Sequence, residues 1–276
     1  MLTSSENQIT SAASSPFDWS TANPEILKQI LLRLSKNEIV KCRQICKSWK
    51  ATTYGRSFWI EKEEYDRESY LKELAEIGKP FLGNDFAILS IRRPFNRNLL
   101  ATGNPEGKNN IARNADRRWE FSRNWIFQSP PLFLDGWFSE EFEDLFDGCY
   151  ETTYGWSDKV LSFDLRETGL TADVFDNQRP RIFFSEYFAN RSDSECVFVM
   201  IISLLNEKNE HIAGDQKRVE IPEYQLQKWQ KFEVCVESYP PGACYVNVKI
   251  MAKGYGCKVA RSHLEVRMEE TPEEFV

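Results

Sequence analysis

Two short amphipathic helices are predicted between residues 23 and 50, and they constrain the N-terminal part of the chain more than any other feature. Pro24 and Glu25 suit a first turn, because a proline there loses no hydrogen bond and a carboxylate complements the helix dipole. Ser35 and Glu38 match the S-x-x-E capping box that opens a second helix. Apolar side chains recur at helical spacing at Ile26, Leu27, Ile30, Leu31, Leu34, Ile39, Val40, Cys42, Ile45, Cys46 and Trp49. Two helices of this size cannot bury so much apolar surface between themselves, so the sequence predicts a partner.

Periodicity alone also fits the start of an ordinary helical domain, but the residue types in this stretch are more specific. The stretch resembles an F-box in its Pro-Glu start, its helix rich in Leu and Ile, and its short break. The later F-box positions are Val40, Cys42-Arg43, Cys46, Trp49 and Phe58-Trp59. An F-box implies docking on a Skp-type adaptor, which links the chain to the cullin and RING subunits of an SCF ubiquitin ligase. The resemblance assigns the adaptor contact to Pro24, Ile26, Leu27, Ile30, Leu31, Leu34, Ile39, Val40, Cys42, Cys46, Trp49 and Trp59.

The charge and cysteine content of the chain narrow its partners and its compartment. The 276 residues include 35 basic and 42 acidic side chains, which gives a net charge of −7 at pH 7. Nucleic acids and anionic membrane surfaces are bound by basic faces, so we expect neither as a partner. Seven cysteines without paired spacing, and a polar N-terminus without a signal peptide, fit a reducing cytosolic or nuclear site, and we expect the cytoplasm. The cysteines are then expected to be small buried hydrophobic residues.

The hydrophobic period changes in the second half of the chain. Alternating apolar and polar residues at 160–165, 231–237 and 245–250 predict half-buried strands. Continuous apolar runs at 181–184 and 197–205 predict strands that are covered on both faces. Turn signals separate these segments at short intervals, which is typical of an antiparallel β-sandwich. The predicted fold class is α+β multidomain, with N-terminal helices, a helical linker and a C-terminal sandwich.

These predictions divide the chain into successive segments. They are a disordered N-terminus at 1–20, the F-box at 21–62, a linker at 63–94, the β-sandwich at 95–268 and an acidic tail at 269–276. The linker is expected to contain a helix from Glu63 to Ile77, because one apolar face is surrounded by charges and Gly78 and Pro80 follow as stop signals. That helix would set the distance between the F-box and the sandwich.

Several stretches of the second half resemble the F-box-associated (FBA) domain of the sugar-recognising F-box family. They are FNRNLL at 95–100, YGW at 154–156, DNQRP at 176–180, YFANRSD at 187–193 and YGCKV at 255–259. The FBA domain is a jelly-roll-like β-sandwich whose end loops carry the substrate site. The resemblance therefore implies a substrate site on the end loops of this sandwich.

The resemblance also implies particular site residues. Glycan-binding members of the family hold the chitobiose core of high-mannose N-glycans with an aromatic residue, an aspartate and a late Tyr-Trp-Lys loop. By position, the aromatic residue is Tyr154 and the aspartate is Asp193, whereas Met251, Ala252 and Lys253 form the late loop. Aromatic rings stack on the C–H faces of sugars, so a chain that lacks the Tyr-Trp pair is expected to bind a protein surface instead. The alternative roles are structural: packing for Tyr154, and an ion pair or a turn for Asp193.

No catalytic or metal-binding motif is evident in the sequence. His211 is expected in a polar loop and His263 before the last strand, and no catalytic signature supports a nucleophile pair of Cys257 with His263. Cys42 and Cys46 are one helical turn apart, but no second pair completes a four-ligand zinc site. We therefore expect a non-catalytic chain without a cofactor or a metal.

Three functions follow from these observations. The first is the substrate-recognition subunit of an SCF ubiquitin ligase, whose sandwich binds a protein for ubiquitination and degradation. The second is a cytosolic lectin-type receptor for the high-mannose N-glycans of misfolded glycoproteins. The third is a scaffold or protein-binding module that promotes no ubiquitination.

Overall fold

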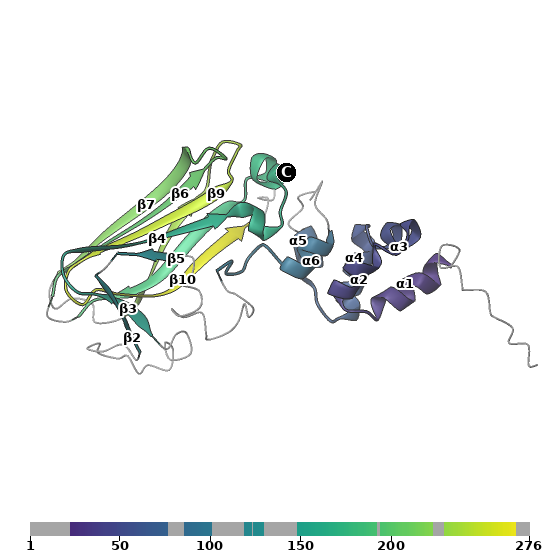
Figure 1. The fold of residues 1–276 in the computed structure, drawn as a ribbon, viewed down its shortest axis with the longest axis horizontal. Coiled ribbons are helices and arrows are strands. Elements are labelled where there is room, and N and C mark those ends of the chain that lie inside the picture. Colours follow the sequence, from purple (N-terminus) through teal and green to yellow (C-terminus); the bar gives the residue numbers. More distant parts are fainter. Residues whose placement is uncertain are drawn as a thin grey trace, which may run out of the picture. The chain divides into compact units, whose positions relative to one another are not determined.

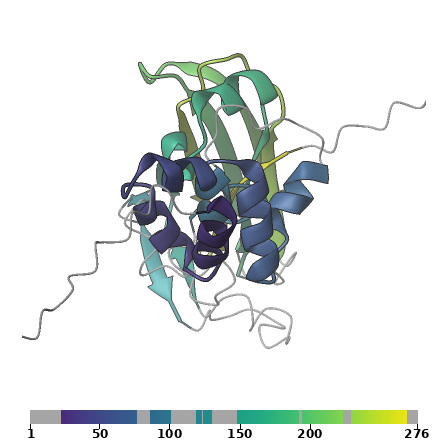
Figure 2. The same cartoon turned by 90° about the vertical axis from the view of Figure 1, so that its right-hand side faces the viewer.

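The computed structural model describes residues 23–76, 86–100, 119–122, 124–129, 148–191, 194–222 and 229–268. The chain forms two compact units, and the division lies between Glu68 and Ser69, inside the predicted linker. Figures 1 and 2 show the helices of the first unit and the two sheets of the second. Among the described residues, no helix has the length and apolar character that a membrane span requires.

The helical unit is built from four short helices around one small core. Its helices are α1 (Pro24–Leu32), α2 (Lys36–Cys42), α3 (Lys47–Thr52) and α4 (Arg56–Tyr65). The predicted capping box is confirmed, because Ser35 accepts from the backbone of Glu38 and the Glu38 carboxylate accepts from the Ser35 N–H. The expected second helix is in fact two helices, since the chain turns at residues 43–46 before Trp49 returns to the core.

The helix predicted from Glu63 to Ile77 is wrong. Helix α4 continues to Tyr65, the chain turns through Arg67 with a φ of 62°, and α5 (Tyr70–Glu76) begins a new helix in the second unit. The Glu63 side chain is only 1% exposed and lies 3.5 Å from the Lys36 ammonium group, so it belongs to the helical unit. Ile77 lies outside the described residues.

The second unit is an antiparallel β-sandwich, as predicted. Its strands are β1 (Trp119–Phe121), β2 (Trp125–Gln128), β3 (Cys149–Thr152), β4 (Trp156–Asp164), β5 (Arg181–Ala189), β6 (Cys196–Leu205), β7 (His211–Ile221), β8 (Gln230–Val236), β9 (Tyr245–Lys253) and β10 (Lys258–Arg267). One sheet has the order β1-β4-β9-β6-β7 and the other β2-β3-β10-β5-β8. From β3 onward the chain passes repeatedly between the sheets, which gives the jelly-roll-like topology (Figure 1).

Short helical segments complete this unit. Helix α6 (Phe86–Arg92) precedes the sandwich, and η2 (Leu165–Thr168) and η3 (Val174–Gln178) follow β4. The Arg92 guanidinium donates to the Glu167 carbonyl at 2.9 Å, so α6 is held against the η2 turn. Gly169 ends that turn with a φ of 82°, a backbone conformation that glycine adopts without strain.

The strands in which apolar and polar residues alternate were predicted correctly, but the predicted positions of the two histidines were wrong. His211 begins β7 instead of lying in a polar loop, and His263 lies inside β10 instead of before it. Strand β7 pairs with β6 along its length, but most of its residues are exposed. An exposed strand of polar residues has no hydrophobic period, and therefore the sequence gave no signal for it.

Strand β6 differs from its prediction on one face. Its inward residues Phe198, Met200 and Ile202 are buried, as expected for the core. On its outer face Val199 is buried, whereas Val197 and Ile201 are only partly buried. The expectation that this strand is covered on both faces is therefore wrong at Val197 and Ile201.

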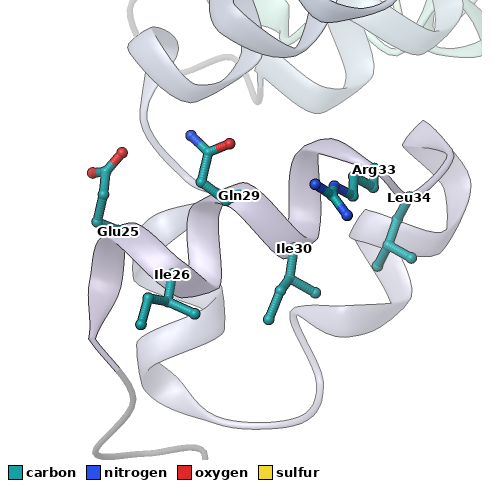
Figure 3. A pocket seen from close by; sticks show the side chains of 6 residues that line it. All are labelled: Glu25, Ile26, Gln29, Ile30, Arg33 and Leu34. Atoms are coloured by element: carbon teal, nitrogen blue, oxygen red, sulfur yellow. The ribbon is translucent and has the colours of Figure 1, made fainter.

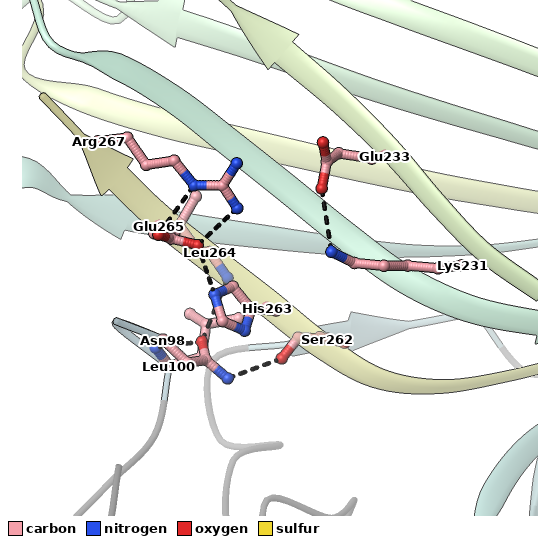
Figure 4. A network of polar contacts seen from close by, with 9 residues as sticks. All are labelled: Asn98, Leu100, Lys231, Glu233, Ser262, His263, Leu264, Glu265 and Arg267. Carbon is pink, nitrogen blue, oxygen red and sulfur yellow. Dashed lines mark hydrogen bonds and ion pairs between the residues drawn. The ribbon is translucent and has the colours of Figure 1, made fainter. Parts of the chain in front are cut away.

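A polar side chain joins the segment before the sandwich to β10. The Asn98 amide donates to the Ser262 carbonyl at 3.1 Å and its oxygen accepts from the Leu264 and Leu100 N–H groups (Figure 4). Beside it on β10, Glu265 accepts from His263 at 2.9 Å and from Arg267. Burial alone would raise the pKa of Glu265, but these hydrogen bonds and charges lower it to about 2.

Two ion pairs are buried within this unit. Lys159 of β4 bonds Glu186 of β5, so the pair connects the two sheets, and the ammonium group lies 4.2 Å from the centre of the Trp119 ring. Burial raises the pKa of Glu186, and Lys159 opposes that rise. The second buried pair joins Lys258 of β10 to Glu151 of β3, and the Lys258 ammonium group also lies 2.9 Å from the Gln128 amide oxygen.

The prediction that the cysteines are small buried hydrophobic residues is wrong for most of them, because Cys42, Cys46, Cys235 and Cys244 are only partly buried and two others form a disulfide. Cys196 and Cys257 form a disulfide, with their Cα atoms 5.9 Å apart, although 61 positions separate them in the sequence. Pairing of β6 with β9 brings the start of β6 beside the turn that follows β9, and no sequence spacing reveals this contact. The free cysteines are Cys42, Cys46, Cys149, Cys235 and Cys244.

Candidate functional site

An exposed apolar groove runs along one face of α1. Ile26, Ile30 and Leu34 point to the same side of the helix, and Glu25, Gln29 and Arg33 border them (Figure 3). The groove has a volume of about 510 Å³, and the Ile26 side chain is 61% exposed. Large apolar side chains in such an exposed cluster indicate a surface for another protein.

The opposite face of α1 packs into the core of the helical unit and so holds the helix in place. Leu27 and Leu31 are completely buried, and Trp59 of α4 is buried with them. The Trp59 indole donates to the Thr53 carbonyl at 2.8 Å, and the Arg43 guanidinium bonds the same carbonyl while lying over the Trp59 ring. The apolar residues of α1 thus divide into a packing face and an exposed face.

The same division applies to all the residues predicted to contact an adaptor. Those on the surface or partly exposed are Pro24, Ile26, Ile30, Leu34, Val40, Cys42 and Cys46. Those buried inside the unit are Leu27, Leu31, Ile39, Trp49 and Trp59. The buried members hold the helices that present the surface, so a direct contact is expected only from the exposed group.

A second exposed cluster lies at one end of the β-sandwich. The rings of Tyr154 and Tyr255 stack with their centres 5.1 Å apart and their planes at 27°. Tyr154 is 74% exposed, and the Arg191 guanidinium lies 5.2 Å from the centre of the Tyr255 ring. We call Tyr154, Tyr255 and Arg191 the aromatic pair site. It offers flat π faces beside a cation, which suits sugar C–H groups, apolar side chains or carboxylates.

The turn at residues 253–257 positions Tyr255. Thr152 accepts from the Gly256 N–H through its carbonyl at 3.0 Å, and its hydroxyl donates to the Gly254 carbonyl at 2.7 Å. Gly254 has a φ of 132°, and a Cβ there would lie 2.2 Å from the Glu195 carbonyl oxygen. Only glycine fits this position, so the turn has one tightly defined path.

The late-loop candidates lie elsewhere than expected. Met251 and Ala252 are inside strand β9, not in a loop, and Lys253 is the last residue of that strand. Ala252 points into the core and is completely buried, whereas Met251 lies on the outer face with Trp156, Val199 and Arg218 around a groove of about 600 Å³. Lys253 is exposed and pairs with Trp156, two residues from Tyr154.

Of the two residues transferred from the family site, Tyr154 lies in the aromatic pair site and Asp193 lies outside the described residues. The sequence reasoning missed Tyr255 and Arg191 as members of this site. Tyr255 and Arg191 belong to the stretches 255–259 and 187–193 that resemble the FBA domain. Their place in the site becomes evident only from their contact in the folded chain. Among the described residues, no group of three or more His, Cys, Asp or Glu side chains is arranged to hold a metal ion.

Comparison with known proteins identifies both units. Residues 23–61 match the F-box domain, and residues 90–271 match the F-box associated region. F-box only protein 27 of Macaca fascicularis is 25% identical over 195 residues, which cover 68% of this chain and 65% of that protein. F-box only protein 6 of Bos taurus is 23% identical over 251 residues, which cover 87% of this chain and 90% of that protein.

Among solved structures, the CBM22-1 xylan-binding domain from Paenibacillus barcinonensis Xyn10C superposes on 55% of this chain and 86% of its own. Its sequence is 12% identical and the TM-score is 0.33, a level on which we base no conclusion. The match to F-box only protein 27 spans slightly less than two thirds of the length of that relative. Because the F-box associated region covers residues 90–271, most of the sequence, the chain belongs to the family of F-box proteins with an F-box-associated region.

Proposed function

We propose that this chain is the substrate-recognition subunit of an SCF ubiquitin ligase. The exposed apolar groove on α1 carries the proposal, because Ile26, Ile30 and Leu34 form a protein-binding face on the segment that matches the F-box domain. In this role the groove binds a Skp-type adaptor and, through it, the cullin and RING subunits.

The chain needs no catalytic residue for this function. The adaptor holds the helical unit, and the β-sandwich holds the substrate within reach of the ubiquitin-charged enzyme. Holding two reactants together raises their effective concentration, and substrate lysines are then modified because of proximity. The aromatic pair site is the proposed substrate contact, with a protein surface as the ligand.

Adaptor binding is tested with a variant that changes the surface and keeps the core. Ile26→Asp places a carboxylate in the groove, and the 61% exposure of Ile26 means that the substitution is compatible with folding. We expect the affinity for a purified Skp-type adaptor to fall at least tenfold, measured by calorimetry on the full chain. Ile126→Asp is the matched control, since Ile126 is also exposed but lies on β2. Equal adaptor affinity for wild type and Ile26→Asp would disprove docking at the groove.

Substrate binding is tested by comparing proteins retained in cells by the wild-type chain and by Tyr255→Ala. We define the Tyr255-dependent proteins as those retained by the first and lost by the second at equal adaptor binding. We expect them to gain ubiquitin and to be degraded faster when the wild-type chain is present. Normal retention without any change in turnover would support the scaffold function instead.

A lectin function has one specific observation in its favour. The exposed stack of Tyr154 on Tyr255 supplies an aromatic platform, even though the Tyr-Trp pair of glycan-binding relatives is missing. A titration of the full chain with chitobiose separates the two ligand classes. Saturable binding that disappears in Tyr154→Ala would make N-glycans the substrate, whereas no binding would leave the protein surface as the ligand.

A further inference from the structure

The Cys196–Cys257 disulfide is placed where it can control the aromatic pair site. Cys196 is the first residue of β6, and Cys257 follows Tyr255 by two residues. Both cysteines are buried, with exposures of 1% and 0%. The bond therefore joins the turn that carries Tyr255 covalently to β6, the neighbour of β9 in its sheet.

Hydrogen bonds also hold this turn along its length, including those that join Thr152 to Gly254 and Gly256. The Cys257 N–H donates to the Thr152 hydroxyl at 3.1 Å, and the Arg191 N–H donates to the Gly256 carbonyl at 3.2 Å. The Ser194 hydroxyl donates to the Tyr255 carbonyl. Tyr255 is 39% exposed, and its ring contacts the Tyr154 ring and the Arg191 guanidinium. The disulfide adds a covalent restraint, two residues from this tyrosine, to these hydrogen bonds.

We propose that the Cys196–Cys257 disulfide is a redox-dependent positioning device for the aromatic pair site. With the bond intact, Tyr255 is held in its stack on Tyr154 and the substrate contact is formed. With the bond reduced, the turn at 253–257 loosens and substrate binding weakens. This inference rests on the proposed function, because it takes the aromatic pair site as the substrate contact.

The chemistry is thiol–disulfide exchange with a dithiol, such as dithiothreitol or a protein of the thioredoxin class. A thiolate of the dithiol attacks one sulfur, forms a mixed disulfide and releases the other cysteine as a thiolate. The second thiol of the dithiol then closes its own disulfide. The products are two cysteine thiols and one oxidised dithiol, with two electrons and two protons transferred. Since both sulfurs are buried, exchange requires the turn to open first, so reduction is expected to be slow.

The remaining cysteines do not offer an alternative pair. Each of the five others is a free thiol in the structure. Burial raises the pKa of Cys149 to about 12, so its thiol stays protonated and unreactive at neutral pH. Cys244 lies before β9, whereas Cys257 lies after it, so the two are at opposite ends of the same strand. Cys244→Ala is therefore a matched control for loss of a cysteine in the sandwich.

The test uses the full chain in three forms: wild type, Cys196→Ser with Cys257→Ser, and Cys244→Ala. Alkylation with N-ethylmaleimide, followed by peptide mass spectrometry, is expected to leave Cys196 and Cys257 linked until dithiothreitol is added. Hydrogen exchange of the amides at 253–257 is expected to become at least tenfold faster in the double variant and in reduced wild type. Exchange at the centre of β6 should change little, which separates a loosened turn from an unfolded sandwich.

Binding is then measured with the Tyr255-dependent proteins as the ligand set. We expect the double variant to retain them at least fivefold less than Cys244→Ala, at equal adaptor binding. Free alkylation of both cysteines without reductant, or equal exchange at 253–257 in all forms, would overturn the inference. Equal retention by the double variant would overturn it and leave the proposed function intact. If no Tyr255-dependent proteins exist in either redox state, the substrate site and this inference both fail.

Discussion

The groove on α1 and the aromatic pair site are both exposed apolar surfaces, but they are constructed differently. Every residue that lines the groove comes from ten consecutive positions, 25–34. The aromatic pair site takes one residue each from positions 154, 191 and 255, which the fold brings together. The groove is therefore a local property of one helix and the two residues that follow it, whereas the second site depends on the correct stacking of the whole sandwich. Disrupting one unit at a time tests this difference.

The largest expected effect comes from Lys159→Ala. This change leaves the Glu186 carboxylate buried without its cation, and breaking one member of a buried pair costs about 3–5 kcal/mol. We expect the sandwich to unfold at a lower denaturant concentration while the affinity of the groove for the adaptor stays the same. Tryptophan fluorescence during urea unfolding and calorimetry with the adaptor measure the two quantities.

The double variant Lys159→Met, Glu186→Leu is the control for this prediction. It removes both charges and keeps the side-chain volume, so we expect it to recover most of the lost free energy of unfolding. If Lys159→Ala also weakens adaptor binding, the two units depend on one another and the proposed contrast is wrong.

An intermediate effect is expected from the acid sensitivity of Glu265. Its pKa in the folded chain is about 2, whereas an unfolded glutamate titrates near ~4.3. A lowered carboxyl pKa stabilises the fold above the unfolded value, and that stabilisation is lost as the pH falls from about 5 to about 2. At neutral pH, Glu265→Gln should cost about 1–3 kcal/mol, because it removes charge-assisted hydrogen bonds to Arg267 and His263.

Unfolding free energies of wild type and Glu265→Gln between pH 3 and pH 7 measure this prediction. The difference between the two proteins should shrink steadily as the pH falls. A difference that stays constant over this range would show that the charge on Glu265 does not stabilise the sandwich.

The smallest expected effect is on the helical unit. Ser35→Ala removes the hydroxyl that accepts from the Glu38 N–H, and loss of such a cap costs about 0.5–2 kcal/mol. We expect a small decrease in the stability of the helical unit and no change in the sandwich, measured by hydrogen exchange of each. Ser35→Asp, which can accept the same hydrogen bond, should restore the stability. A sandwich that becomes equally less stable would contradict the independence of the two units.

The same contrast explains how much of the structure the sequence predicts. Capping and periodicity act over a few residues, so the Ser35 cap, the apolar residues of α1 and the strands β4, β8 and β9 were predictable, but the division of those apolar residues into buried and exposed was not. Strand β7 was not predictable, because its mostly polar sequence has no hydrophobic period. It is a strand because its backbone pairs with β6. The break after Tyr65 was also missed, since the buried Glu63 looks like any surface glutamate in the sequence.

The candidate site on the sandwich was predicted only in part for the same physical reason. Tyr154 was found from the resemblance, but the Cys196–Cys257 bond and the Tyr255 stack depend on contacts between residues far apart in the chain. Ala252 was assigned to a loop because its neighbours in the sequence were aligned with loop residues. Strand pairing of β9 with β4 and β6 instead turns it into the core.

The bond between Lys159 and Glu186 has a consequence for how this sequence can change over generations. Either residue replaced alone leaves one buried charge without its partner, so most single substitutions at these positions would be eliminated by selection. The two positions are therefore expected to change together or not at all. Related chains that carry one of these residues should carry the other, and their joint presence offers a fixed point for aligning β4 with β5 in distant members of the family.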